Sequence, residues 1–296
     1  MNICSFNVNS VKARLALLLQ WLTVRDGQAD GQADGQAGGQ ADGQAGIDVL
    51  CLQEIKTVET GFPFAEFQAL GYHCEVFGQK AYNGVAICSK YEVRDVSKGL
   101  GDMRWDAQSR VIAATIAGIR VINTYAPHGD VRGSEKFNYK MGWYKRLLAY
   151  LTEGHPATEG IVMVGDFNVA RADMDVFDPD VFTDAVIAMP EERAVFEEVL
   201  GLGFTDAFRY LYPKRQQFTQ WDYSGGAFWK NQGVRIDYVC ISAPLIPTLK
   251  EVEVDLWSRK RRPPSDHAPI VATLEKKMEA PVYIQGGTDL PPHPPL

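Results

Sequence analysis

The chain has 296 residues, of which 46% are hydrophobic and 23% are charged. This composition is typical of a folded globular protein with a large core, and it excludes wholesale disorder, collagen and a long coiled coil. The formal net charge of −7 argues against a protein that coats nucleic acid through net charge, but it leaves room for a local basic groove.

Short runs rich in Val, Ile, Cys and aromatic residues recur along the chain and predict strands. The predicted strands are 3–8, 47–52, 73–77, 84–89, 110–116, 120–125, 161–165, 236–242 and 268–273. Helical patterns occur at about 11–24, 134–152 and 190–200, and the last opens with proline and acidic residues typical of a first turn. Many strands with few helices between them predict an α/β fold in which two packed sheets are flanked by helices.

Two segments lack the apolar residues that a core requires. Residues 26–46 are a tandem repeat of Gly, Ala, Gln and Asp, which predicts a flexible insert in a surface loop. Residues 277–296 end in GGTDLPPHPPL and predict a disordered tail. Because the apolar pattern continues between them, we expect one domain over residues 1–276.

The sequence shows no run of about 18 apolar residues and no export signal near its start. We therefore expect a cytoplasmic protein that does not associate with membranes. Its five cysteines form no CxxC pair, and they are Cys4, Cys51, Cys74, Cys88 and Cys240. Most of them lie in apolar runs, so we expect reduced core residues and no zinc site.

Polar side chains follow or adjoin several predicted strands, where a rigid scaffold often holds catalytic groups. They are Asn7, Asn9, Gln53, Glu54, Tyr125, Asp166, Asn168, Asp237, Ser265, Asp266 and His267. Carboxylate and amide oxygens suit Mg²⁺ or Mn²⁺, whereas zinc favours Cys and His. A hydrated divalent ion beside carboxylates can neutralise a phosphate oxygen and stabilise a leaving oxyanion, so this set predicts phosphoester hydrolysis.

Each of these residues also has a structural interpretation. Glu54 could be a solvated acid at a strand end, and Asp166 with Asn168 could form an ordinary turn. Asp237 lies between apolar neighbours, where an unpaired acid is costly, and Arg235 is a possible structural partner. The catalytic interpretation depends on the groups occurring together, each beside a predicted strand.

Eight segments, taken in order, resemble the exonuclease III family of DNA repair nucleases, within the wider endonuclease, exonuclease and phosphatase fold. They are SFNVNS, VLCLQEIK, YNGVAICSK, NTYAPHG, KFNYKMGWY, VMVGDFNVARADMD, RIDYV and PSDHAPI. The resemblance implies a single-domain, four-layered α/β sandwich. It also implies a Mg²⁺- or Mn²⁺-dependent phosphodiesterase acting on double-stranded DNA. Such an enzyme cuts 5′ to abasic sites, removes 3′-blocking groups and degrades DNA from 3′ to 5′. We expect a monomer.

The resemblance implies a metal site around two residues. Glu54 would be the principal ligand, and Asn7 would lie next to it. The other members of the implied metal site are Asp166, Asn168, Asp266 and His267.

The resemblance also implies catalytic roles. Asp166 would position or deprotonate the attacking water, and Asn168 would hold that water or bind phosphate. Asp237 would orient His267, and the imidazole would contact the scissile phosphate or the leaving oxygen. Tyr125 would hydrogen-bond the phosphate or stabilise the leaving 3′ oxygen.

The predicted DNA contacts are basic, imidazole or aromatic side chains near these groups, because phosphate contacts supply most sequence-independent affinity. They are Lys56, His128, Lys136, Lys140, Trp221, Arg259, Lys260, Arg261 and Arg262. His128 departs from the Asn or Gln usual in the family. Gln220 and Val234 stand where relatives often place large apolar side chains that line the pocket for an extruded sugar. An apolar wall could come instead from Trp221, Phe228 or Trp229.

Two other functions remain open. A phosphoesterase of the same fold could act on RNA, an inositol phosphate or a phospholipid headgroup, although KFNYK and RIDY favour DNA. A scaffold could recruit partners through the insert or the proline-rich tail, although a scaffold does not need the complete set of polar groups.

Overall fold

The computed structural model describes residues 1–27 and 46–275, and its strands form two six-stranded mixed sheets. The predicted tail at 277–296 and most of the predicted insert lie outside the described residues. The described ends of the insert are Asp26, Gly27 and Gly46. Asp26 caps the first helix and pairs with Lys90 at 2.7 Å.

The first sheet has the strand order β11-β12-β1-β2-β4-β3. Its strands are β1 (Asn2–Asn7), β2 (Val49–Gln53), β3 (His73–Phe77), β4 (Val85–Ser89), β11 (Leu249–Val254) and β12 (Ile270–Leu274). Only β1 and β2 run parallel, and the other neighbouring pairs are antiparallel.

The second sheet has the strand order β5-β6-β7-β8-β10-β9. Its strands are β5 (Val93–Lys98), β6 (Val111–Ile116), β7 (Ile119–Tyr125), β8 (Ile161–Asp166), β9 (Phe204–Asp206) and β10 (Asp237–Ser242). Here β7 and β8 are the parallel pair, and the remaining pairs are antiparallel.

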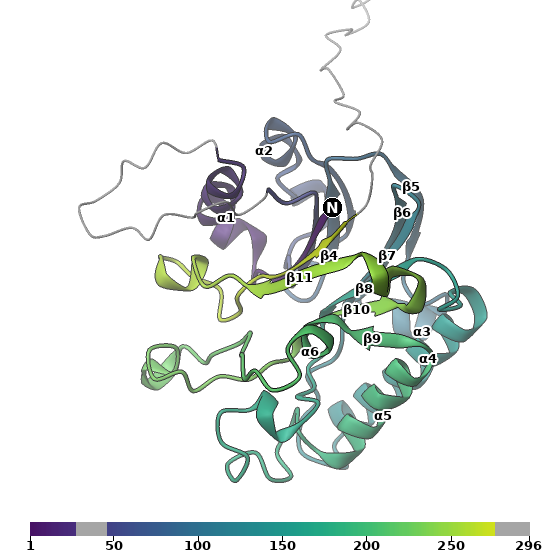
Figure 1. Cartoon of the computed structure of the whole chain (residues 1–296), viewed down its shortest axis with the longest axis vertical. Helices are drawn as coiled ribbons and strands as arrows, with labels where there is room; N and C mark the ends of the chain where they lie inside the picture. The colour runs from purple at the N-terminus through teal and green to yellow at the C-terminus, as the bar shows by residue number, and fades with distance from the viewer. Residues whose placement is uncertain (28–45, 276–296) are drawn as a thin grey trace, which may run out of the picture.

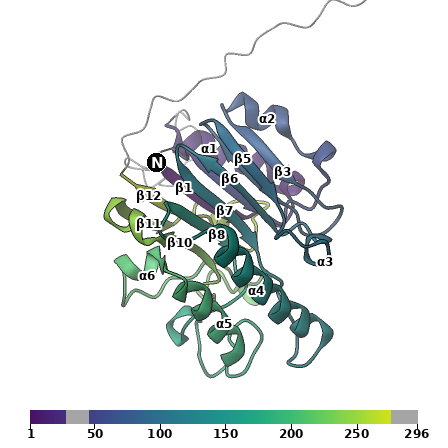
Figure 2. The same ribbon diagram turned by 90° about the vertical axis from the view of Figure 1, so that its right-hand side faces the viewer.

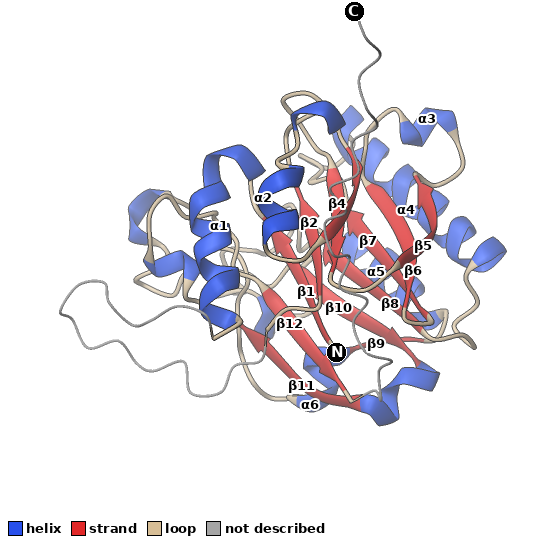
Figure 3. Cartoon of the chain, turned by 90° about the horizontal axis from the view of Figure 1, so that it is seen from above, coloured by secondary structure: helices blue, strands red, loops and turns tan. Residues whose placement is uncertain are grey.

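Helices cover the outer faces of both sheets and complete four layers (Figures 1 and 3). They are α1 (Val11–Arg25), α2 (Phe64–Ala69), α3 (Met103–Asp106), α4 (Glu135–Gly154) and α5 (Pro190–Gly201). The short helix α6 (Ala207–Leu211) instead packs on the apolar layer between the sheets through Ala207 and Phe208. The first two pack on the first sheet, and α4 and α5 lie across the second sheet (Figure 2). The predicted single-domain α/β sandwich is confirmed.

The core has one apolar layer between the sheets and one beneath each set of helices. Aliphatic residues such as Ile3 and Val49 of the first sheet meet Val121 and Val162 of the second. Because these strands are buried on both faces, they appear in the sequence as continuous apolar runs rather than as alternating patterns. This is why the central strands could be predicted.

Three strands escaped prediction, and all of them are short, exposed or polar. β5 is largely exposed, β9 has three residues, and β11 reads LKEVEV. Edge strands like these bury only part of one face, so their sequences lack a continuous apolar run. The three long helices lie close to their predicted positions.

The expectation that all five cysteines are reduced is wrong for one pair. Cys74 and Cys88 are directly opposite each other on β3 and β4 and form a disulfide. The remaining cysteines are free and buried: Cys4, Cys51 and Cys240. The pairing depends on strand register, which the spacing of the cysteines does not show. In the part of the chain that the structure describes, no helix is long and apolar enough to cross a membrane.

Candidate active site

The predicted catalytic groups converge because the strands that carry them end or begin at one edge of the paired sheets. Asn7 ends β1, Glu54 follows β2, and Asp166 ends β8. Asp237 begins β10, which is antiparallel to β8, so Asp237 is directly opposite Asp166. His267 lies three residues before β12, which is antiparallel to β1. Residues far apart in the chain therefore meet at one edge.

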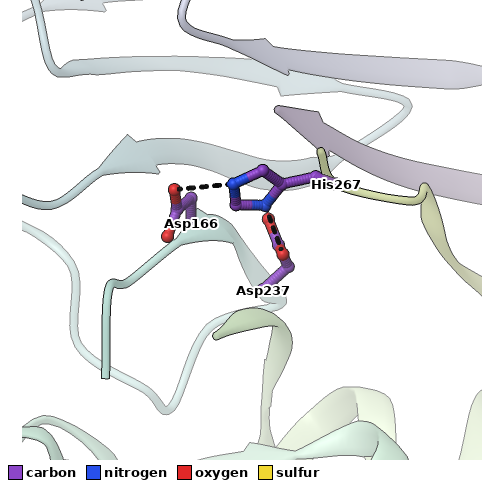
Figure 4. Close-up of side chains that lie close together, drawn as sticks. All are labelled: Asp166, Asp237 and His267. Carbon is purple, nitrogen blue, oxygen red and sulfur yellow. Dashed lines mark hydrogen bonds and ion pairs between the residues drawn. The ribbon is translucent and has the colours of Figure 1, made fainter. Parts of the chain in front are cut away.

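At the centre of the site, His267 lies between two carboxylates (Figure 4). Its Nδ1 is 2.8 Å from Asp237 Oδ2, and its Nε2 is 3.8 Å from Asp166 Oδ2. All three residues are buried, and one ligand atom of each lies within 4.8 Å of the others. The second oxygen of Asp237, Oδ1, is buried and has no hydrogen-bond partner among the described residues. A buried carboxylate oxygen without a donor is costly, which is typical of a functional rather than a structural group.

The electrostatics of this cluster favour proton transfer near neutral pH. Burial raises the pKa of Asp166 to about 7, with Asp237 adding to the shift and His267 opposing it. Burial alone would lower the pKa of His267, but Asp237, Asp266 and Asp166 outweigh it and raise the pKa to about 10. The imidazole is therefore cationic at neutral pH, while Asp166 can exchange a proton there.

Glu54 lies beside this cluster, joined to it through an amide. Asn7 Nδ2 donates to both Glu54 Oε1 and Asp166 Oδ2, each at 2.9 Å. Lys56 Nζ is 2.8 Å from the other oxygen of Glu54. Burial would raise the pKa of Glu54, but the hydrogen bonds from Asn7 and Lys56 lower it below its ordinary value. Glu54 is therefore ionised.

A second path joins Asp266 to Glu54. Asn9 Nδ2 donates to Asp266 Oδ1 at 2.9 Å, and Lys56 donates to Asn9 Oδ1 at 2.5 Å. Burial opposes the ionisation of Asp266, yet His267 and Asn9 lower its pKa. The site thus holds ionised carboxylates on either side of Lys56.

The donor set fits a divalent cation that prefers oxygen ligands. Four carboxylates and neighbouring amides are available, and the described residues of the site include one imidazole and no cysteine. Asn7 turns its NH₂ group toward the acids, while its Oδ1 accepts from Asn9 N at 3.0 Å. In this arrangement Asn7 bridges Glu54 and Asp166, and its role as a metal ligand stays a prediction.

Asn168 and Tyr125 border the same cluster. Asn168 N donates to Asp166 Oδ1 at 2.9 Å, and its side chain donates to Ala126 O at 3.0 Å. The Arg110 guanidinium stacks over the Tyr125 ring at 4.7 Å. Burial and Glu54 raise the pKa of Tyr125 well above its ordinary value. The phenol therefore keeps its proton and can act as a hydrogen-bond donor.

The prediction that Lys140 contacts DNA is wrong. Its side chain is fully buried and forms an ion pair of 2.5 Å with Glu192, and its ammonium also donates to Asn168 O at 2.7 Å. Phe137 and Tyr144 lie three and four residues away on α4 and are buried too. Lys140 therefore belongs to the inward face of the helix. The basic pattern KFNYK could not distinguish this face from the exposed one.

Two further predicted DNA contacts are also wrong, and Arg235, the alternative structural partner of Asp237, has other partners. Trp221 is 1% exposed and Arg259 is 6% exposed, so neither presents a surface to DNA. Arg235 does not pair with Asp237. It binds Asp175 and Asp206 instead.

The remaining predicted DNA contacts lie at or near the surface. They are Lys56, His128, Lys136, Lys260, Arg261 and Arg262. Lys56 is engaged with Glu54, and Lys136 lies 3.6 Å from Asp130. The structure is compatible with DNA contacts from these residues, which stay predictions.

Gln220 and Val234 pair through backbone hydrogen bonds of 3.0 and 2.9 Å, and Gln220 also pairs with His267. Gln220 therefore lies beside the backbone of His267, and Val234 lies on the other side of Gln220. Val234 is only 4% exposed, whereas Trp229 is 75% exposed. Trp229, with the exposed Tyr223, gives this region aromatic surface that is available for contact.

Two hydroxyl groups organise the site: Ser265, which the sequence singled out without a role, and Thr219, which the sequence did not reveal. Thr219 Oγ1 accepts from Asp237 N at 3.1 Å. Ser265 Oγ donates to Asn7 O at 2.7 Å and accepts from His267 N at 3.2 Å. Because the partner of Thr219 is a backbone group of a distant segment, no motif marks this hydroxyl in advance.

Comparison with known proteins agrees with this geometry. Residues 4–267 match the model of the Endonuclease/Exonuclease/phosphatase family. Exodeoxyribonuclease III of Haemophilus influenzae is 36% identical over 240 residues, which cover 77% of this chain and 90% of that protein. An AP endonuclease from Archaeoglobus fulgidus has a TM-score of 0.84 and 36% identity, covering 93% of this chain and 100% of that one. The 3′ phosphatase NExo from Neisseria, solved with a product DNA hairpin, has a TM-score of 0.82 and 38% identity over the same shares. The chain therefore belongs to the endonuclease/exonuclease/phosphatase family, in its exonuclease III branch.

Proposed function

We propose that this chain is a DNA repair nuclease of exonuclease III type. It hydrolyses phosphodiester bonds 5′ to abasic sites, removes 3′-blocking groups and degrades DNA from 3′ to 5′. The observation that carries this proposal is the buried cluster in which His267 lies between Asp237 and Asp166. A cationic imidazole attracts a phosphate, and a carboxyl group with a pKa near neutrality can accept a proton from water.

The side chains of the site divide the chemistry between them. Asp166 takes the proton of the attacking water, and the Asn168 backbone holds Asp166 in place. Asp237 orients the imidazole of His267, which faces the phosphate. Tyr125, protonated at neutral pH, donates a hydrogen bond to the phosphate or to the leaving 3′ oxygen.

Mg²⁺, or Mn²⁺ in its place, is the metal that we propose for the site. Glu54 and Asp266, with the amide of Asn7 beside them, would hold it, because hard oxygen donors suit these ions. When bound, the ion neutralises charge on the phosphate and on the leaving oxygen. Lys56 also places a positive charge next to Glu54.

The substrate is double-stranded DNA with abasic sites or damaged 3′ ends. The exposed cations of the 260–262 run and Lys56 supply phosphate contacts near the site. We propose that residues 1–276 act as one catalytic domain. We also propose that the protein works as a monomer in the cytoplasm, at the nucleoid, without membrane association.

Two labelled duplexes test the proposal, one with an internal abasic analogue and one with a blocked 3′ end at a nick. Each is incubated with Mg²⁺ and with EDTA. We expect metal-dependent cleavage of at least one of them. Incision of the abasic duplex would mean that the sugar pocket works despite Gln220 and Val234. Processing of the 3′ end alone would mean that these residues restrict the enzyme to 3′ termini.

Matched RNA and inositol phosphate substrates serve as controls. Hydrolysis of either, with neither DNA duplex cleaved, would overturn the DNA assignment while leaving the phosphoesterase chemistry intact.

A further inference from the structure

Arg259 is a buried cation whose position the proposed roles do not explain. It is 6% exposed. No carboxylate of the described residues lies within ion-pair distance of it, whereas the buried Arg25 and Arg235 each have two acidic partners. Its Nε is buried and makes no hydrogen bond to a described residue. Burying a guanidinium without an acidic partner destabilises the fold. We therefore expect Arg259 to have a functional role that offsets this cost.

The guanidinium of Arg259 is held by aromatic rings instead of acids. It lies 4.9 Å from the centre of Phe228, 5.8 Å from Trp221 and 5.9 Å from Tyr223. These three rings belong to residues 218–229, which we call the aromatic loop. In Figure 1 the yellow-green turn at Ser258–Lys260 lies above the green turn of this loop, at the left of the molecule.

The same guanidinium also holds the segment that carries the catalytic histidine. Its Nη1 donates to the carbonyl of Ser265, in residues 263–268, which we call the histidine loop. Ser265 in turn accepts from His267 N at 3.2 Å and donates to Asn7 O at 2.7 Å. One arginine therefore contacts both loops, and one of its contacts is two residues from the imidazole.

The two loops are also joined directly by backbone hydrogen bonds. Trp221 N donates to Asp266 O at 2.9 Å, and Ala268 N donates to Thr219 O at 2.8 Å. Thr219 Oγ1 accepts from Asp237 N, so the aromatic loop contacts both members of the His267–Asp237 pair. A shift of one loop against the other would change the alignment of the imidazole with its carboxylate.

We propose that Arg259 is a positioning residue for His267, acting by holding the histidine loop against the aromatic loop. The inference rests on the proposed function, because it concerns the rate at which the site turns over DNA. Catalysis is sensitive to such alignment, and a displacement of about 1 Å can cost on the order of 100-fold in rate. Arg259 does not touch the substrate in this arrangement.

Arg261 provides a matched control two residues away. Its guanidinium stacks on Trp257 at 3.7 Å, and its Nη1 donates to Trp257 O at 3.0 Å. The chemistry is the same as at Arg259, but Arg261 is exposed and contacts neither loop through these bonds. We expect Arg259→Met to lower kcat by about 10- to 100-fold with KM within about twofold. Because Arg261 is a proposed phosphate contact, Arg261→Met should raise KM, and it serves as a control for the position of the histidine loop and not for activity.

Arg259→Lys tests the mechanism by partial rescue. Lysine keeps a cation over the rings and an N–H donor for Ser265 O, so we expect it to recover most of the loss in kcat. A kcat for Arg259→Met within twofold of the parent would overturn the proposal. The proposal would also be overturned if the loss of kcat equalled the fraction of protein that a thermal melt shows to be unfolded at the assay temperature.

A proton NMR measurement tests Arg259 independently of nuclease activity. The His267 Nδ1–H, which donates to Asp237, should give a downfield signal that Arg259→Met shifts and Arg261→Met leaves in place. If the parent cleaves no DNA, the proposed function fails while this signal still tests the positioning role. If Arg259→Met does not fold, Phe228→Leu removes the nearest ring, and an unmoved signal there would overturn the inference.

Discussion

Arg235 and Asp237 are two residues apart in the chain, but they belong to two different clusters of buried charged groups. The two clusters differ in whether their polar atoms have hydrogen-bond partners. The ion-pair cluster joins Arg235 to Asp175 and Asp206 with three hydrogen bonds of 2.8, 3.0 and 2.8 Å. The site cluster places His267 between Asp237 and Asp166, and His267 Nε2 is 3.8 Å from Asp166 Oδ2. Within it, Asp237 Oδ1 has no partner among the described residues. The charged groups around Arg235 thus have hydrogen-bond partners, whereas the site cluster leaves one carboxylate oxygen without a partner in the described part of the chain.

The difference shows what each cluster is for. A buried pair with every polar atom satisfied holds segments together, and removing one member leaves a costly unpaired charge. A buried cluster with excess acid and an unfilled oxygen has shifted pKa values and is ready to accept a proton or a cation. Lys140 and Glu192 repeat the satisfied pattern just behind Asn168. Changes in the two kinds of cluster should therefore separate activity from stability.

The largest effect is expected from the site cluster. Asp166→Asn should lower kcat by about 100- to 10,000-fold, because an amide cannot accept the proton of the attacking water. DNA affinity should stay within about threefold, and thermal stability should not fall, because the substitution removes a buried carboxyl group of raised pKa. Single-turnover cleavage and a binding titration measure both. An equal loss of binding and turnover would contradict the role of Asp166.

Breaking the Lys140–Glu192 pair should affect stability instead. Lys140→Met leaves the Glu192 carboxylate buried and unpaired, so we expect a loss of about 3–5 kcal/mol in the free energy of unfolding. Chemical denaturation measures this loss. DNA affinity of the folded protein should be unchanged.

The double variant Lys140→Met with Glu192→Gln should recover much of that stability, since the glutamine oxygen can still accept from Met189 N. A loss of DNA affinity without loss of stability would instead restore Lys140 as a DNA contact.

A smaller effect is expected at Arg235. Arg235→Lys cannot reproduce the forked contact with Asp175, so we expect a loss of about 1.5–3 kcal/mol in unfolding free energy. The change lies two residues from Asp237, so a measurement of kcat tests whether the Arg235 cluster and the site cluster act independently. We expect kcat to stay within about threefold of the parent. A loss of kcat as large as that of Asp166→Asn would show that the two clusters are not independent.

The smallest effect is expected from the insert. Asp26 lies directly against Gly46, so a short link can join the two described ends. Replacing residues 28–45 by a four-residue Gly-Ser link should change unfolding free energy by about 1 kcal/mol or less and leave kcat unchanged. Thermal melts and cleavage assays of the shortened chain check this expectation. A large loss of either would show that the insert packs against the fold.

Sequence patterns predicted the central fold because the central strands are buried on both faces. Val49–Gln53 and Ile161–Asp166 appear as apolar runs, and the polar residues at their ends indicate the position of the site. The exposed strand Val93–Lys98 has no such pattern and was missed. The partnership of Asp237 with His267 followed from the family resemblance, and the structure confirms the contact.

By itself, the sequence determined the central strands, the three long helices, the two-sheet fold and the strand-end positions of Glu54, Asp166, Asp237 and His267. These follow from apolar patterns within a few residues of each position. Only the tertiary structure decided that Lys140 points inward, that Cys74 faces Cys88, and that Arg259 stacks on an aromatic loop. Such features depend on partners that are distant in sequence, as for Asn7 and Asp166, which are 159 residues apart. Strand register and helix packing bring them together, and no local pattern of residues encodes either.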